Sequence, residues 1–242
     1  MTFSDREHPH IAPILAGLTE LGHELPREIG KAVEAWQRLG DELTTARVEA
    51  SEVSPGAVAE RYVLDALAAA EAELRWRNVK VDALAEAQAM AAASVAGAVG
   101  RSSETIYGIL RKSLADILAQ VRKLEPLVRD LPLTNPDLIL RIADRAKIEA
   151  YQRLASEADR LKVLRDVQFQ LRRSSGGGTE GVDFESYARP IARSSRPENR
   201  LAALLWTATT PGVEPVVRTP AEAVAAEQEA REARRRGQEA AA

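Results

Sequence analysis

Residues 107–131 read YGILRKSLADILAQVRKLEPLVRDL, and this stretch decides the fold class of the chain. Its apolar residues recur at steps of three and four, without an error, for more than three heptads. Such spacing keeps one narrow stripe of a helix turned toward a partner helix. The stripe, called the seam below, consists of Tyr107, Leu110, Leu114, Ile117, Val121, Leu124, Val128 and Leu131. We expect the seam to be an interface, either within one bundle or between copies of the chain.

Other long helical patterns lie on both sides of the seam. Residues 26–50 and 57–99 each carry an apolar stripe at helical spacing, and residues 137–173 carry another after a turn at Asn135 and Pro136. Helices of this length joined by short turns are typical of bundles rather than compact globules. We predict an all-α fold, an elongated antiparallel helical bundle or coiled coil.

The composition changes at residues 174–181, which read SSGGGTEG and have the glycine content of a linker. We therefore predict a helical body at residues 1–173 and a mobile tail at residues 174–242. The tail is expected to end in a polar helix, because Thr219, Pro220 and Glu222 fit a capping box with proline at the first helical position.

A short apolar run after the linker is the candidate docking element of the tail. A linker ahead of a short amphipathic helix is a common way to present a peptide to a partner protein. The alternative is a helix that folds back onto the body. The residues concerned are Leu201, Leu204, Leu205 and Trp206.

Few side chains offer catalytic chemistry. The chain has no Cys, and its three His residues all lie within the first 23 positions. His8 and His10 have no fixed carboxylates beside them in the sequence and make a poor metal site. Catalysis would have to rest on scattered carboxylates alone. We expect no catalytic residue, no metal and no cofactor, and hence not an enzyme.

The charge is unevenly distributed along the chain. Residues 1–100 carry 9 basic and 16 acidic side chains, whereas residues 101–175 carry 15 and 10. Binding of nucleic acid through the arginines of residues 141–200 is therefore an alternative function. Against it stand the acidic pI near 5.8 and the acidic residues that alternate with the arginines. The arginines in question include Arg172, Arg173, Arg189, Arg193, Arg196 and Arg200, with a further run at Arg234, Arg235 and Arg236.

The seam and the neighbouring stripes favour a non-catalytic assembly or scaffolding protein. Arg77 and Gln88 interrupt the stripe of residues 57–99, and polar residues at single stripe positions often set register or oligomeric state. An alternative is that they reach solvent at a helix crossing. We expect a homo-oligomer that offers its tail to a protein partner, and bacteriophage or prophage morphogenesis is one setting for such chains.

No membrane association is expected from the sequence. The polar start of the chain has no features of a secretory signal. The most apolar stretch, residues 87–100, is shorter than the roughly 20 residues that span a bilayer. We therefore expect a soluble protein in the cytoplasm, or in a virion if the chain is phage-encoded.

Overall fold

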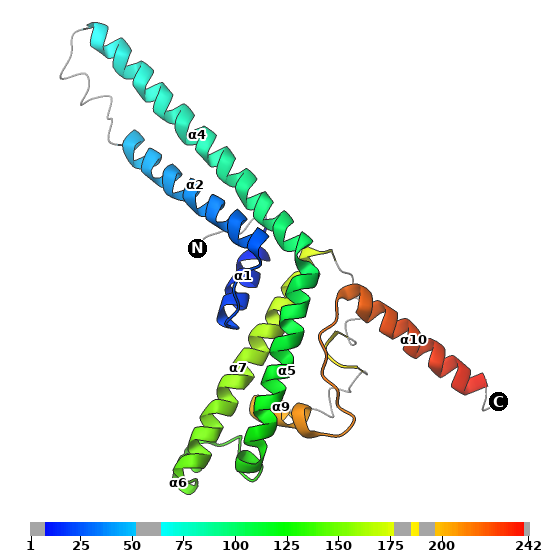
Figure 1. The fold of residues 1–242 in the computed structure, drawn as a ribbon. Coiled ribbons are helices and arrows are strands. Elements are labelled where there is room, and N and C mark those ends of the chain that lie inside the picture. The colour runs from blue at the N-terminus through cyan, green and yellow to red at the C-terminus, as the bar shows by residue number, and fades with distance from the viewer. Residues whose placement is uncertain (1–7, 52–63, 177–184, 189–196, 240–242) are drawn as a thin grey trace. The chain divides into compact units, whose positions relative to one another are not determined.

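The computed structural model describes residues 8–51, 64–176, 185–188 and 197–239, and this part of the chain is all-α (Figure 1). It contains eight helices, and no strand forms there beyond an isolated bridge between Tyr187 and Pro215. The all-α prediction is confirmed. The chain divides into two compact units: unit 1 comprises Met1–Ile11 and Pro26–Ser102, and unit 2 comprises Ala12–Leu25 and Ser103–Ala242.

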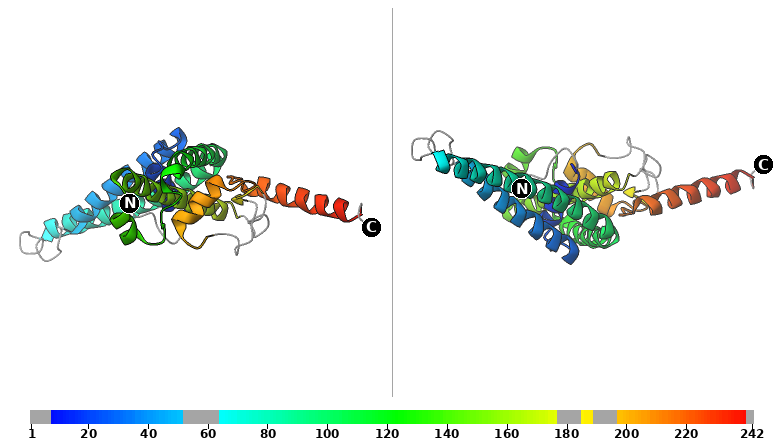
Figure 2. Two further views of the ribbon diagram at one scale, coloured as in Figure 1. Left: turned by 90° about the horizontal axis from the view of Figure 1, so that it is seen from below. Right: turned by 90° about the horizontal axis from the view of Figure 1, so that it is seen from above.

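Unit 1 is built on α2 (Arg27–Ser51) and α4 (Leu64–Arg101), which lie side by side (Figures 1 and 2). Glu49 pairs with Lys80 at 3.1 Å, and Glu28 pairs with Arg101 at 3.6 Å. Residue numbers in these contacts rise along one helix as they fall along the other, so the two helices are antiparallel.

The contact between α2 and α4 uses the stripes expected from the sequence. The two polar interruptions in α4 also face α2, because Arg77 donates to the Glu49 carbonyl at 2.6 Å and the Gln88 amide lies against Gly40. The first part of the expected helix at residues 57–99 falls outside the described residues. The buried residues of α2 are Ile29, Val33, Trp36, Leu43 and Ala46.

Unit 2 is centred on α5 (Ser103–Val128), along which α7 (Arg145–Ser174) runs back in the opposite direction (Figure 1). The short helix α9 (Arg200–Thr209) packs on both. A further helix, α1 (Ile11–Glu20), brings Gly17 against α7. Helix α5 ends two residues after Pro126, as expected for a proline that removes one backbone hydrogen bond.

The prediction of a single helix at residues 137–173 is wrong, because the structure has two helices there. Helix α6 (Pro136–Ile142) begins as predicted, with the Asn135 side chain accepting from the Leu138 N–H at 3.1 Å. It ends where Ala143 adopts extended backbone, and Asp144 then caps α7 by accepting from the Lys147 N–H at 2.9 Å. A good N-cap residue thus starts a new helix although the helical spacing of apolar residues continues across this position.

The C-terminal region belongs to unit 2 rather than forming a separate part from residue 174. Residues 185–188 pair with 214–218 through backbone hydrogen bonds, such as Val216 N–H to the Ser186 carbonyl at 2.9 Å. The last helix, α10 (Pro220–Glu239), has the predicted capping box, since Thr219 and Glu222 exchange hydrogen bonds of 2.7 and 3.2 Å. Most of the predicted linker lies outside the described residues.

The approach of α1 to α7 predicts that Gly17→Ala destabilises the protein. A methyl group on Gly17 would overlap the Cγ2 methyl of Val167 and come within 3.4 Å of Val163. Because these β-branched side chains are stiff, the overlap should cost about 1–3 kcal/mol. The matched control is Gly108→Ala on α5, where open space surrounds the new methyl and helix propensity should add about 0.5–1 kcal/mol. Chemical denaturation of both variants checks the two signs.

Candidate functional site

The seam lies inside unit 2. Seven of its eight residues, from Tyr107 to Val128, are buried, and Leu131 is half-buried in the turn that follows α5. Helix α5 packs against α7 and α9 of the same chain. The seam therefore has partners within the chain, and a contact between copies does not need it.

The candidate docking run forms α9 and packs on unit 2. Leu201 and Leu204 are buried, whereas Leu205 and Trp206 are half-buried. Polar contacts attach both ends of the helix, because Asn199 donates to the Leu133 carbonyl at 3.3 Å and Arg122 donates to the Ala208 carbonyl at 3.0 Å. This position corresponds to the folded-back alternative, with only part of the run accessible to a partner.

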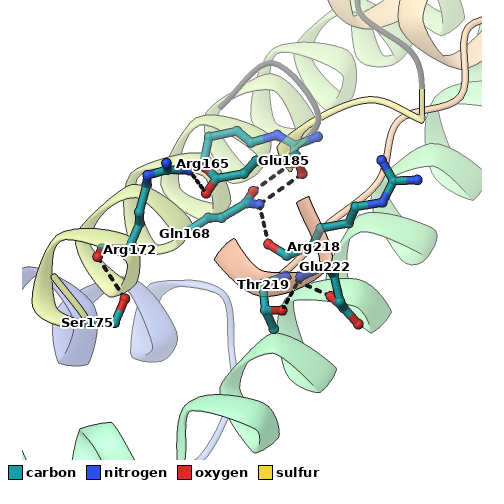
Figure 3. Close-up of polar contacts among 8 residues, drawn as sticks. All are labelled: Arg165, Gln168, Arg172, Ser175, Glu185, Arg218, Thr219 and Glu222. Atoms are coloured by element: carbon teal, nitrogen blue, oxygen red, sulfur yellow. Dashed lines mark hydrogen bonds and ion pairs between the residues drawn. The ribbon is translucent and has the colours of Figure 1, made fainter. Parts of the chain in front are cut away.

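Three polar side chains of α7, those of Arg165, Gln168 and Arg172, bind the extended C-terminal segments (Figure 3). Arg165 donates to the carbonyls of Val216 and Ser186 at 2.8 and 3.0 Å. Gln168, which is almost fully buried, donates to the carbonyls of Glu185 and Arg218 at 3.0 and 3.2 Å. The sequence around Gln168 does not indicate this role, because its partners lie 17 and 50 residues away along the chain.

A buried ion pair joins Arg172 of α7 to Glu185. Burial raises the pKa of Glu185, and the Arg172 guanidinium opposes this shift without cancelling it. The Tyr107 hydroxyl is also buried and finds no hydrogen-bond partner in the described part of the chain. Burial first, and then the Glu185 carboxylate, raise the pKa of Tyr107, so this phenol stays protonated.

A pocket of about 310 Å³ adjoins these side chains. Its polar groups are already committed, because Arg165 and Gln168 bind backbone carbonyls. No group of three or more metal-binding side chains occurs among the described residues. We therefore assign the polar side chains of α7 to holding the C-terminal segments in place. The pocket is lined by Leu161, Arg165, Gln168, Phe169, Glu185, Ser186, Tyr187 and Thr207.

Several arginines that suggested nucleic-acid binding are in contacts within the chain. Arg145, Arg160 and Arg200 form ion pairs with Glu149, Glu157 and Asp159 respectively. Arg165 and Arg172 hold the C-terminal segments, as above. Arg189, Arg193 and Arg196 fall outside the described residues. Binding of nucleic acid stays a prediction, and no contact in the described regions adds support to it.

Large apolar side chains are exposed on the face of α4 that is turned away from α2. Trp76, Val79 and Met90 are 64%, 56% and 63% exposed. Val79 is nine residues from Gln88, and nine residues amount to two and a half helical turns, so it lies opposite the α2 contact. Residues on this face recur at steps of four and three, and we call them the outer stripe: Ala72, Trp76, Val79, Ala83, Glu86, Met90 and Ala93.

Helix α4 also has an unusual hydropathy for a helix that is so little buried. Residues Glu71–Arg101 are long and apolar enough to cross a membrane by length and composition, yet only 22% of the most apolar window is buried. The most apolar stretch seen in the sequence, residues 87–100, forms the C-terminal part of a helix that the structure describes from Leu64 onward. One such helix is weak evidence for a membrane span, because the core helix of a soluble protein passes the same test.

Comparison with known proteins gives no family for this chain: no protein-family model matches it, and no curated protein or solved structure matches it at a significant level. Among the described elements, the outer stripe of α4 leaves three large apolar side chains exposed along one helix face, those of Trp76, Val79 and Met90.

Glu185 and Glu222 both contribute to the contacts of the C-terminal segments, and we expect their ionisation to change the free energy of unfolding in opposite directions. Burial keeps the pKa of Glu185 above the usual 4.5, so ionisation of this group costs stability as the pH rises past 4.5. Glu185→Gln removes this loss. The free energy of unfolding of the variant, relative to wild type, should therefore increase between about pH 4 and about pH 7. Urea denaturation across this pH range measures it.

Glu222→Gln is the matched control for this experiment. Burial alone would raise the pKa of Glu222, but the Thr219 N–H and the Arg111 guanidinium, 2.5 Å away, outweigh it and lower the pKa below 4.5. The ionised form therefore stabilises the fold above 4.5. Relative to wild type, Glu222→Gln should lose stability as the pH rises through this range. If the free energy of unfolding relative to wild type changed with pH in the same direction for both variants, the opposite pKa shifts of Glu185 and Glu222 would be contradicted.

Proposed function

We propose that this protein is a non-catalytic assembly protein whose copies associate through unit 1. The observation that supports this proposal is the outer stripe of α4, which α2 leaves uncovered. Contiguous exposed apolar surface marks interaction sites on proteins in water. Heptad spacing favours a helix as the partner, because it keeps the stripe aligned with a second helix over several turns.

The size of the stripe suits a reversible contact. Fully burying a large apolar side chain contributes about 1.5–3 kcal/mol, so Trp76 and Val79 from each of two copies contribute on the order of 10 kcal/mol. Association costs about 4–15 kcal/mol in lost translational and rotational freedom. Because the two quantities are similar, we expect an oligomer whose population depends on protein concentration.

Unit 2 offers less for a contact of this kind. Its seam and its α9 face are covered within the chain. Helix α6 exposes Leu140 and Ile142, but it has only seven residues and no room for a heptad stripe. In this proposal unit 2 is the folded body that each copy carries into the assembly. An origin in bacteriophage morphogenesis stays a prediction from the type of sequence.

The outer stripe predicts that Trp76→Glu weakens self-association without unfolding the chain. We expect the wild type to reach at least twice the 26.3 kDa of one chain as its concentration rises. Because Trp76 is mostly exposed, the substitution should leave the helix content unchanged while placing a charge in the contact. Light scattering after size exclusion, over a range of concentrations, should show a dissociation constant raised at least about tenfold.

Ile142→Glu is the matched control, because Ile142 is 60% exposed but lies on α6. It should leave the mass unchanged. A wild-type mass of one chain at every concentration would contradict self-association. Dissociation by Ile142→Glu but not by Trp76→Glu would contradict the role of unit 1 and place the contact on unit 2.

A further inference from the structure

We propose that the outer stripe binds the outer stripe of a second copy in antiparallel orientation, with Trp76 and Val79 of both copies at the centre. This inference rests on the proposed self-association and specifies its geometry. It follows from the charged residues that flank the stripe, because these residues distinguish the possible arrangements of two α4 helices.

Four charged residues border the central part of the outer stripe. Glu73 and Lys80 lie along one edge, and Arg75 and Asp82 lie along the other, since each pair is seven residues apart and thus nearly in line along the helix. All four side chains are exposed. Each edge therefore carries one negative and one positive charge.

In an antiparallel pair of helices, like edges face each other. When Trp76 is placed in a layer with Val79 of the partner copy, Glu73 falls opposite the partner's Lys80. On the other edge, Arg75 falls opposite the partner's Asp82. Two-fold symmetry repeats each pair, so all four charged positions of both helices meet an opposite charge.

The same alignment suits the sizes of the side chains in the stripe. The layers next to the central ones bring Ala83 opposite Ala72 of the partner copy. Small residues at these layers let the helices approach closely, while Trp76 and Val79 fill the centre. A large aromatic residue near the middle of a contact, with small and charged residues around it, is typical of stable interfaces.

Other arrangements bring like charges together. In a parallel pair in register, unlike edges face each other, and Arg75 falls opposite the partner's Lys80. An antiparallel pair shifted by one heptad places Lys80 opposite Lys80 and Asp82 opposite Asp82. Like charges in such positions destabilise a contact, so charge selects the antiparallel alignment centred between Trp76 and Val79.

Existing contacts within the chain decide which edge is best to test. Glu73 pairs with Arg77 at 2.8 Å, and Lys80 pairs with Glu49 at 3.1 Å, both at exposed positions. Substitutions on that edge would also alter unit 1 itself. The edge of Arg75 and Asp82 is therefore the cleaner one for charge reversal.

Reversing the charge of Arg75 should change the dissociation constant in opposite directions in an antiparallel and in a parallel pair of helices. In the antiparallel pair, Arg75→Glu and Asp82→Arg each create two repulsive contacts and should raise the dissociation constant about 3- to 10-fold, whereas the double variant R75E/D82R should restore it. In a parallel pair, Arg75→Glu would tighten binding through the partner's Lys80. The control Arg38→Glu, at an exposed position of α2, should change little. Tightening by Arg75→Glu, or no restoration in the double variant, would overturn the proposal.

Cross-linking tests the register directly, because the chain has no Cys of its own. In full-length Val79→Cys the two thiols lie near the centre of the contact, and a short bis-maleimide should join the copies. In Met90→Cys the two thiols lie about 38 Å apart along the helix axes and should not be joined. Equal cross-linking of both variants indicates a parallel pair and overturns the proposal.

The failure of this inference can be told apart from the failure of the proposed function. If the wild type associates but neither charge reversal nor Val79→Cys behaves as expected, only the antiparallel contact is overturned. If the wild type is a monomer at all concentrations, self-association itself is wrong. A monomer that binds vesicles of phosphatidylcholine and phosphatidylglycerol, and loses binding in Trp76→Glu, overturns both and assigns the outer stripe to a lipid surface.

Discussion

Helices α2, α4, α5 and α7 each carry an apolar stripe that is stable only when it leaves water, and the arrangement within each unit follows from how these stripes are covered. In unit 2 the seam of α5 is covered by α7 and α9. In unit 1 α2 covers one face of α4. Helix α4 carries a second stripe on its other face, where Trp76 and Met90 remain exposed, and we propose that this uncovered stripe brings copies of the chain together.

Polar contacts in unit 2 complement this apolar packing. Arg165 and Gln168 of α7 donate hydrogen bonds to backbone carbonyls of the C-terminal segments, which have few backbone partners of their own. The Arg172–Glu185 pair adds a buried contact whose net stabilisation is small, because desolvation offsets the attraction. Loss of either partner alone would leave a buried charge, so these contacts specify one position for the segments more than they add stability.

Local signals in the sequence predicted some helix boundaries and missed others. The cap at Asn135 and the capping box at Thr219 were identified correctly, because each depends on a few neighbouring residues. The break before Asp144 was missed, since apolar residues continue at helical spacing across it. In the structure Ile139 is buried and Leu140 is exposed, so Ile139 and not Leu140 faces the core at α6. A periodic pattern does not show where a helix is interrupted when the residues on both sides keep the same spacing.

The sequence by itself determined the all-α class, the seam and several helix ends, because helix propensity, capping and heptad spacing act over a few residues. Only the tertiary structure decided which stripes are covered within the chain. Burial of a side chain depends on segments far away in the sequence: Gln168 meets residues 17 and 50 positions later, and the outer stripe became visible only when α2 was seen to cover the opposite face of α4. The exposed stripe that supports the proposed function was therefore not evident from the apolar spacing of residues 57–99 alone.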